Sequence, residues 1–239
     1  MDIRIALTIL LTVVPFVVLL RYYYRRDLFR EPRRALVRTF LLGLAITVPA
    51  VPVEIGLSAI PLGAAGPLTT ALVSAFVIAA IPEEALRLLV LRGYCARRST
   101  FDEPMDAIVY GATAALGFAA LENILYVADG GLVTAAVRSV TSVPMHATWG
   151  AVLGYYVARA RRGGKQSDIW RGLAIAVAAH GLFDFVLMGA ALLAAERGDE
   201  PGVGLAVLGL LVAFVVTVAV SWIAVLRLIR VCIESRSRA

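Results

Sequence analysis

The sequence has few residues capable of thiol or imidazole chemistry. Its 239 residues include two cysteines, Cys95 and Cys232, and two histidines, His146 and His180. Neither cysteine is expected to have a structural or catalytic role, because both are expected on the cytosolic side, where thiols stay reduced. No serine stands in a Ser-His-Asp or Ser-Lys pattern, and no aspartate pair carries the flanking motif of an aspartyl protease. The two histidines are the more informative because both fall inside long apolar segments.

Charge is scarce as well, and the composition identifies the surroundings of the chain. Charged residues make up 17% of the sequence, hydrophobic residues 60%, and the mean hydropathy is +0.85, which is too apolar for a soluble domain. A membrane-spanning helix needs about 20 apolar residues. Seven segments meet this requirement: 5–20, 36–60, 68–91, 107–127, 132–158, 172–195 and 203–226. We therefore expect an all-α transmembrane helix bundle that forms one integral membrane domain over residues 1–239, embedded in a lipid bilayer.

The net charge of +6 reflects membrane topology rather than a nucleic-acid partner. The basic residues lie in alternate loops and in the tail, not on one face of a helix. The positive-inside rule then predicts an N-terminus outside and a C-terminus inside the cell. Residues 1–20 are expected to remain as the first helix, because no small-residue cleavage site precedes Arg21.

Two adjacent acids, Glu83 and Glu84, occupy the last third of the apolar segment 68–91. Each acid near a bilayer interior costs roughly 2.5–3.5 kcal/mol, so such groups often mark a functional site. Arg87 follows at helical spacing and is expected to pair with one acid, leaving the other free. Pro82 is expected to open the backbone beside them. A purely structural ion pair would explain only one of the two acids.

Other polar residues fall inside the later apolar segments. Glu122 and Asn123 follow a stripe of small residues along which another helix can approach closely, although both could instead bond neighbouring backbone. Asp184 lies four residues after His180 and is expected to orient its imidazole. Glu54, near the outer end of its segment, fits an interfacial acid better than part of a polar access route.

The depth of each polar group can be estimated from the rise of a helix. Counted from the cytosolic boundary at about 1.5 Å per residue, Glu84 and His180 lie ~12–14 Å deep, His146 and Asp184 ~20 Å, and Glu122 ~24 Å. The first four could share one cavity. Glu122 is expected to be the outlier.

Carboxylates and imidazoles in a water-accessible membrane pocket suit peptide-bond hydrolysis. A glutamate would take a proton from water while a histidine or a metal ion stabilises the oxyanion. The same residue types also build ion or proton pathways in transporters, although no inverted repeat is evident here. A protease-like scaffold that binds transmembrane helices without cutting them is a third alternative.

The motifs that carry these residues resemble those of the PrsW family of bacterial intramembrane proteases. The resemblance covers about residues 70–190 and rests on five motifs in order: Glu83-Glu84-x-x-Arg87, Asp106 through Tyr110-Gly111, Gly117-Phe118-Ala119-x-x-Glu122-Asn123-x-x-Tyr126, Pro144-x-His146 and His180-x-x-x-Asp184. It implies a helical endopeptidase of the bacterial cytoplasmic membrane, related more distantly to the CPBP group that includes the CAAX prenyl endopeptidases. It also implies a single-span membrane protein as substrate, such as a membrane-anchored anti-sigma factor.

Carried over to this chain, the resemblance assigns the water-activating base to Glu83 or Glu84. It places His180 and Asp184 near the scissile carbonyl. The expected catalytic set is Glu83, Glu84, Glu122, His146 and His180, supported by Arg87, Asn123 and Asp184. The CPBP pattern Phe-x-x-x-His is not kept, because Phe118 is followed four residues later by Glu122.

A metal ion is the open question of the mechanism. His146, His180 and Glu122 could bind Zn²⁺ and leave a fourth position for water or substrate. The same residues could also work without a metal, as a glutamic-type site. The sequence lacks His-Glu-x-x-His, so both alternatives stay open.

Overall fold

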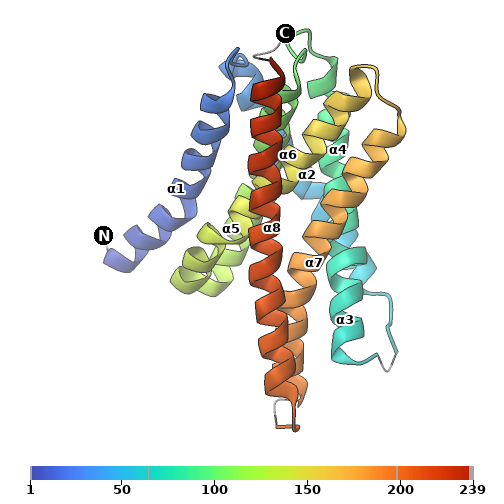
Figure 1. Ribbon diagram of the computed structural model, residues 1–239. Helices are drawn as coiled ribbons and strands as arrows, with labels where there is room; N and C mark the ends of the chain where they lie inside the picture. Colours follow the sequence, from blue (N-terminus) through green and yellow to red (C-terminus); the bar gives the residue numbers. More distant parts are fainter. Residues whose placement is uncertain (1, 64, 198, 237–239) are drawn as a thin grey trace.

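The computed structural model describes residues 2–63, 65–197 and 199–236, and within these ranges the chain is built from helices with no strand. This confirms the all-α prediction; residue 1 and residues 237–239 of the predicted domain lie outside the described residues. Figure 1 shows the helices gathered into one bundle. In chain order they are α1 (Ile3–Arg26), α2 (Arg33–Ser58), α3 (Pro67–Val73), η1 (Ser74–Ala80), α4 (Ile81–Gly93), η2 (Cys95–Arg97), α5 (Pro104–Val140), α6 (Ser142–Arg161), α7 (Ser167–Arg197) and α8 (Val203–Arg236).

Within the described ranges, five helical segments are long and apolar enough to cross a membrane. They are Ile3–Arg26, Arg33–Ser58, Pro104–Arg161, Ser167–Arg197 and Val203–Glu234. The chain is therefore a multi-pass membrane protein. This number is smaller than the seven expected segments for two reasons. The third expected segment is divided among α3, η1 and α4, and Pro104–Arg161 contains both the fourth and the fifth.

The prediction that residues 132–158 form one continuous helix is wrong. Gly131 has φ 62° and ψ −148°, a backbone conformation that glycine adopts without steric cost, and it breaks α5. Thr141 then separates α5 from α6. Residues 132–140 consequently form a short helical arm, and a separate helix, Ser142–Arg161, carries His146.

The centre of the bundle is the contact between α5 and α6, where the two backbones touch. A Cβ atom added to Gly111 would lie 2.0 Å from the carbonyl oxygen of Gly150, and one added to Gly154 would lie 2.0 Å from that of Ala107. The small-residue stripe expected on α5 is thus confirmed as a helix–helix contact. It brings the two helices that carry Glu122 and His146 close together.

This contact predicts a specific sensitivity to one methyl group. Gly111→Ala should lower the free energy of unfolding by about 2–3 kcal/mol, because the added Cβ pushes α6 away from α5. Gly56→Ala is the matched control, since Gly56 also lies in a helix but has no heavy atom within 4 Å of an added Cβ. The measurement is the thermal unfolding of both variants in detergent. Equal midpoints would contradict the close packing.

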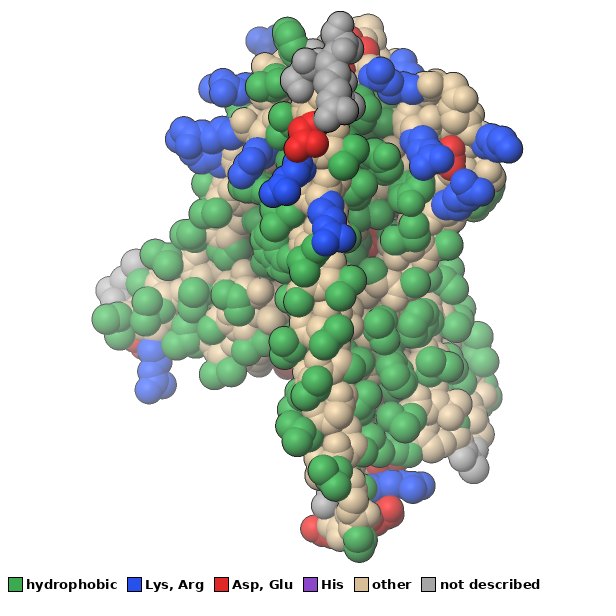
Figure 2. Space-filling view, viewed as in Figure 1, with side chains coloured by type: hydrophobic (Ala, Val, Ile, Leu, Met, Phe, Trp, Pro, Cys, Tyr) green, Lys and Arg blue, Asp and Glu red, His purple; other side chains and the backbone are tan. Residues whose placement is uncertain are grey.

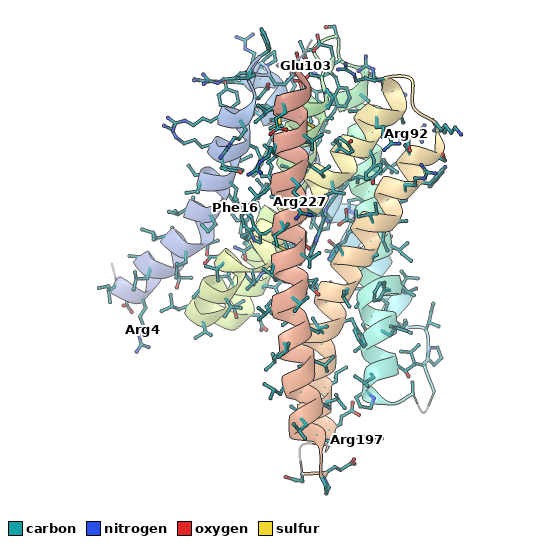
Figure 3. All side chains as sticks on the ribbon, viewed as in Figure 1. Arg4, Phe16, Arg92, Glu103, Arg197 and Arg227 are labelled. Atoms are coloured by element: carbon teal, nitrogen blue, oxygen red, sulfur yellow. The ribbon has the colours of Figure 1, made fainter. Side chains whose placement is uncertain are left out.

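The two ends of the bundle differ in charge. Figure 2 shows Lys and Arg side chains gathered around one end, while hydrophobic side chains cover most of the visible surface below it. The last turns of α8 lie at the basic end (Figure 1). Arg92 lies towards this end, whereas Arg197 lies at the opposite end (Figure 3).

Candidate active site

A π-helix leads into the pair of acids. The segment η1, Ser74–Ala80, runs directly into α4, where Pro82 occupies the first turn. Proline offers no backbone N–H and its ring crowds the carbonyl four residues earlier, so the hydrogen-bond pattern widens before it. The expected opening of the backbone beside Glu83 is confirmed. Both acids face the protein interior, with Glu83 5% and Glu84 0% exposed.

Arg87 binds both acids at once. Its Nη2 donates to Oε2 of Glu83 at 2.6 Å, and its Nη1 donates to Oε1 of Glu84. The expectation that one acid is paired and the other free is therefore wrong. The guanidinium is a planar fork with several donors, so it reaches the residues three and four positions earlier together. The Phe118 ring covers it, with 4.4 Å between the ring centroid and the Arg87 Cζ.

His180 lies between carboxylates from two helices. Its Nδ1 is 3.0 Å from Oε1 of Glu84, and its Nε2 is 3.2 Å from Oδ2 of Asp184. The expected orientation of His180 by Asp184 is confirmed. The Nε2 atom is also 3.9 Å from Oε2 of Glu83. Trp149 stacks on the imidazole at 4.4 Å between centroids, which fixes the plane of the ring.

His146 is held between Arg87 and Glu122. Its Nδ1 lies 2.9 Å from Nη2 of Arg87, and because a guanidinium can only donate, Nδ1 is the acceptor. In the neutral ring the proton is therefore on Nε2, which lies 2.9 Å from Oε2 of Glu122. The expectation that Glu122 is an outlier in depth is wrong. The estimated difference from His146 was only about 4 Å, which a glutamate side chain spans.

Arg138 belongs to this site and was not expected from the sequence. Its Nε donates to Oδ1 of Asn123 at 2.9 Å, and its Nη2 lies 3.2 Å from Oε1 of Glu122. The Tyr126 ring lies 4.2 Å from its Cζ. Asn123 thus bonds a side chain rather than backbone. The available signal was a lone arginine inside an apolar segment, which is costly unless it has a partner.

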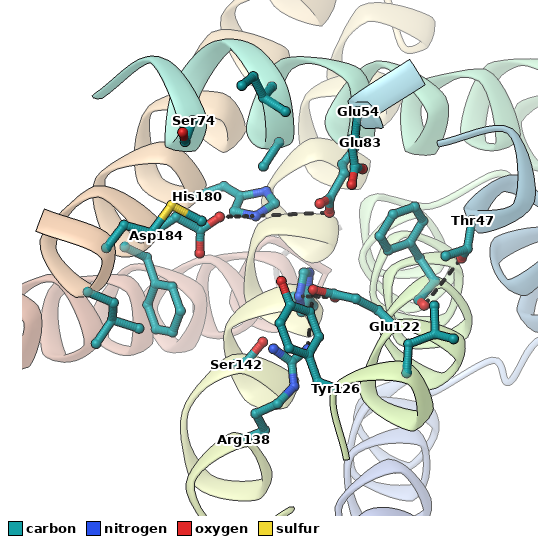
Figure 4. Close-up of a pocket in the computed structure, with 18 of the residues that line it drawn as sticks. Thr47, Glu54, Ser74, Glu83, Glu122, Tyr126, Arg138, Ser142, His180 and Asp184 are labelled. Carbon is teal, nitrogen blue, oxygen red and sulfur yellow. Dashed lines mark hydrogen bonds and ion pairs between the residues drawn. The ribbon is translucent and has the colours of Figure 1, made fainter. Parts of the chain in front are cut away.

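These side chains line a cavity of about 520 Å³. Figure 4 shows residues from several helices directed towards it. Glu54 lines the cavity together with Glu83, which favours the access route over the interfacial interpretation. The lining residues are Thr47, Val51, Glu54, Ile55, Ser58, Ser74, Ile78, Ala79, Glu83, Phe118, Glu122, Leu125, Tyr126, Val137, Arg138, Thr141, Ser142, His146, His180, Phe183, Asp184, Leu187 and Met188.

Three of the buried residues fit a metal ion. Glu83, His146 and His180 each offer one ligand atom, and these atoms lie within 4.8 Å of one another. Two imidazoles and one carboxylate form a common donor set of catalytic zinc sites. Carboxylates orient metal-binding histidines, and those of Glu122 and Asp184 contact the two rings here. On His146 a metal ion would have to replace either this contact or the hydrogen bond from Arg87, because both ring nitrogens are engaged. Glu83 thus joins the two histidines where the sequence favoured Glu122.

Comparisons with known proteins agree with these motifs. A family model described as PrsW family intramembrane metalloprotease matches residues 31–221. The chain is 34% identical over 179 residues to Protease PrsW of Geobacillus kaustophilus, covering 74% of this chain and 77% of the relative. It is 34% identical over 179 residues to Protease PrsW of Bacillus subtilis, covering 73% and 80%. Protease PrsW of Clostridioides difficile is 28% identical over 188 residues, covering 75% and 78%. No solved structure matches the chain.

Proposed function

We propose that this chain, which belongs to the PrsW family of intramembrane metalloproteases, cleaves a single-span substrate inside the cavity formed by α2, η1, α4, α5, α6 and α7. As a member of this family it is a peptide hydrolase that acts on membrane proteins. A membrane-anchored anti-sigma factor is a substrate of this kind. We place the enzyme in a bacterial cytoplasmic membrane. The main support for this proposal is that Glu83, His146 and His180 line the same cavity.

Glu83 is the proposed base that activates water. It lines the cavity, whereas Glu84 is fully buried and is not among the lining residues. Glu84 instead contacts Arg87 and His180 and is proposed to hold both in place. Glu83 would accept a proton from water as it attacks the scissile carbonyl, and would return that proton to the leaving amine.

The two histidines are proposed to act on the opposite side of the scissile bond. His180 Nε2 lies 3.9 Å from Glu83 Oε2, so the imidazole N–H that would stabilise the oxyanion lies beside the carboxylate that would accept the proton of water. Glu122 and Arg138 would fix the orientation of His146. If a metal ion were held by Glu83, His146 and His180, it would supply Lewis acidity to the water and the carbonyl, and Glu83 would then serve as a ligand instead of as the base.

We further propose seven membrane crossings, with α3, η1 and α4 together forming the third. The basic end of the bundle would face the cytosol, which puts the N-terminus outside and the C-terminus inside. The cavity residues of α2 then run from Thr47 to Ser58, in the outer half of a helix that spans Arg33–Ser58. Those of α7 begin at His180 and continue to Met188, towards the outer end.

The position of the cavity predicts where the substrate is cut. The purified enzyme, reconstituted with a tagged single-span substrate, should produce a new terminus in the outer half of the substrate's membrane segment. Mass spectrometry of both fragments gives the position of the cut. A cut at the cytosolic end would contradict the proposal, because no cavity-lining residue among those described lies there. Ion flux through proteoliposomes in place of cleavage would support the transporter alternative instead.

A further inference from the structure

One carboxylate of the cavity lacks the partner that the others have. Glu83 pairs with Arg87 at 2.6 Å, Glu122 with Arg138 at 3.2 Å, and Asp184 with His180 at 3.2 Å. Among the described residues, the side chain of half-buried Glu54 has no hydrogen bond and no cation within ion-pair distance. The cavity therefore contains one acid whose charge is not matched by a close cation.

The side chain of Glu54 faces the cavity rather than the lipid. Thr47, Val51, Glu54, Ile55 and Ser58 all line the cavity, and their spacing puts them on one face of α2. Glu54 provides the only carboxylate on this face. The other four are apolar or carry a hydroxyl group, so none of them can neutralise it. Figure 4 shows Glu54 among the residues around the cavity.

An unmatched carboxylate in the membrane is costly, and a ligand that brings a cation would offset this cost. The arginine that lines the cavity, Arg138, and the fully buried Arg87 both have carboxylate partners already. Arg87 holds both acids of α4, and Arg138 holds Glu122 and Asn123. The missing cation would therefore have to enter the cavity with the ligand.

We propose that Glu54 binds a basic side chain, Lys or Arg, of the substrate on the outer side of the scissile bond; this rests on the proposed proteolytic function. Thr39 of α2 contacts Cys95 just beyond the end of α4, which gives the two helices a common level. Counted from it, Glu54 lies ~22 Å along α2 and Glu83 ~18 Å along α4, so Glu54 is the outer of the two acids. The bound cation thus lies between the catalytic groups and the outer surface. Long basic side chains reach such positions easily, because their apolar stems remain in the apolar part of the cavity.

The test is a comparison of substrates by wild-type and variant enzymes. Residues on the outer side of the mapped cut are changed one at a time to Lys, Gln and Glu, and kcat/KM is measured for each substrate. At one position the wild type should prefer Lys over Gln by about tenfold, which corresponds to about 1.4 kcal/mol. Glu54→Gln should bring this ratio to about one. Glu54→Lys should reverse it in favour of the Glu substrate.

Asp129→Asn is the control, because Asp129 is an exposed acid of α5 that does not line the cavity. It should keep the wild-type ratio. Cleavage of the Gln substrate by the wild type establishes proteolysis independently, so the ratio reports on Glu54 alone. A wild type with no preference at any position, or a preference that persists in Glu54→Gln, would overturn the proposal.

Discussion

Glu83→Gln is expected to reduce the rate of substrate cleavage by about 10³-fold or more while the protein remains folded. The amide cannot accept a proton from water, but its oxygen can still accept the hydrogen bond from Arg87 Nη2, now 2.6 Å from Oε2 of Glu83. The loss should therefore fall on kcat rather than on folding. The measurement is single-turnover cleavage in proteoliposomes, with thermal unfolding measured on the same preparations.

Glu84→Gln distinguishes the proposed role of Glu84 from that of Glu83. Glu84 is proposed to position Arg87 and His180 without touching water, and loss of such an orienting contact costs about 10–100-fold. The two variants should thus differ by at least about tenfold, with Glu83→Gln the less active. Equal losses, or a larger loss in Glu84→Gln, would assign the base to Glu84 instead.

Arg87→Ala should destabilise the protein more than any other single change at the site. Arg87 is 0% exposed and is the shared partner of two buried acids, so its removal leaves two carboxylates without their cation. Breaking a buried ion pair by removing one partner costs about 3–5 kcal/mol. The midpoint of unfolding in detergent should fall sharply, and cleavage should fall with it.

Arg92→Ala is the matched control, since Arg92 lies on the same helix but is exposed. Its removal should change the free energy of unfolding by less than about 0.5 kcal/mol. Arg87→Lys should recover only part of the loss, because a single ammonium cannot reproduce the fork that reaches both acids. If Arg87→Ala unfolds at the same temperature as Arg92→Ala, the shared ion pair contributes nothing to stability.

The chemistry of the site was more predictable than its geometry. Charged groups in apolar segments are costly, so Glu83, Glu84 and Asp184 could be recognised from the sequence, and the two histidines joined them through their position. The break at Gly131 could not be recognised, because a positive φ leaves no trace in hydropathy. Arg138 was therefore not predicted to belong to the site.

Two predictions were wrong because they considered each residue only along its own helix. The spacing of Arg87 was read as a choice between two acids, although a guanidinium has donors for both. The depth of Glu54 was estimated along its own helix, which could not show that α2 turns this residue towards the cavity. In both cases the deciding information was the position of a neighbouring group, which spacing alone does not contain.

Disulfide cross-linking of a bound substrate tests most directly whether the scissile segment enters the cavity. The substrate carries a single cysteine next to its cleavage site. The enzyme carries Glu83→Gln, which slows cleavage, and Ser74→Cys, because Ser74 lines the cavity. Val212→Cys, on the exposed face of α8 and at a similar distance from the outer end, is the control. A cross-link is expected with Ser74→Cys and none with Val212→Cys. Equal cross-linking of both, or cross-linking of Val212→Cys alone, would show that the scissile segment does not enter this cavity.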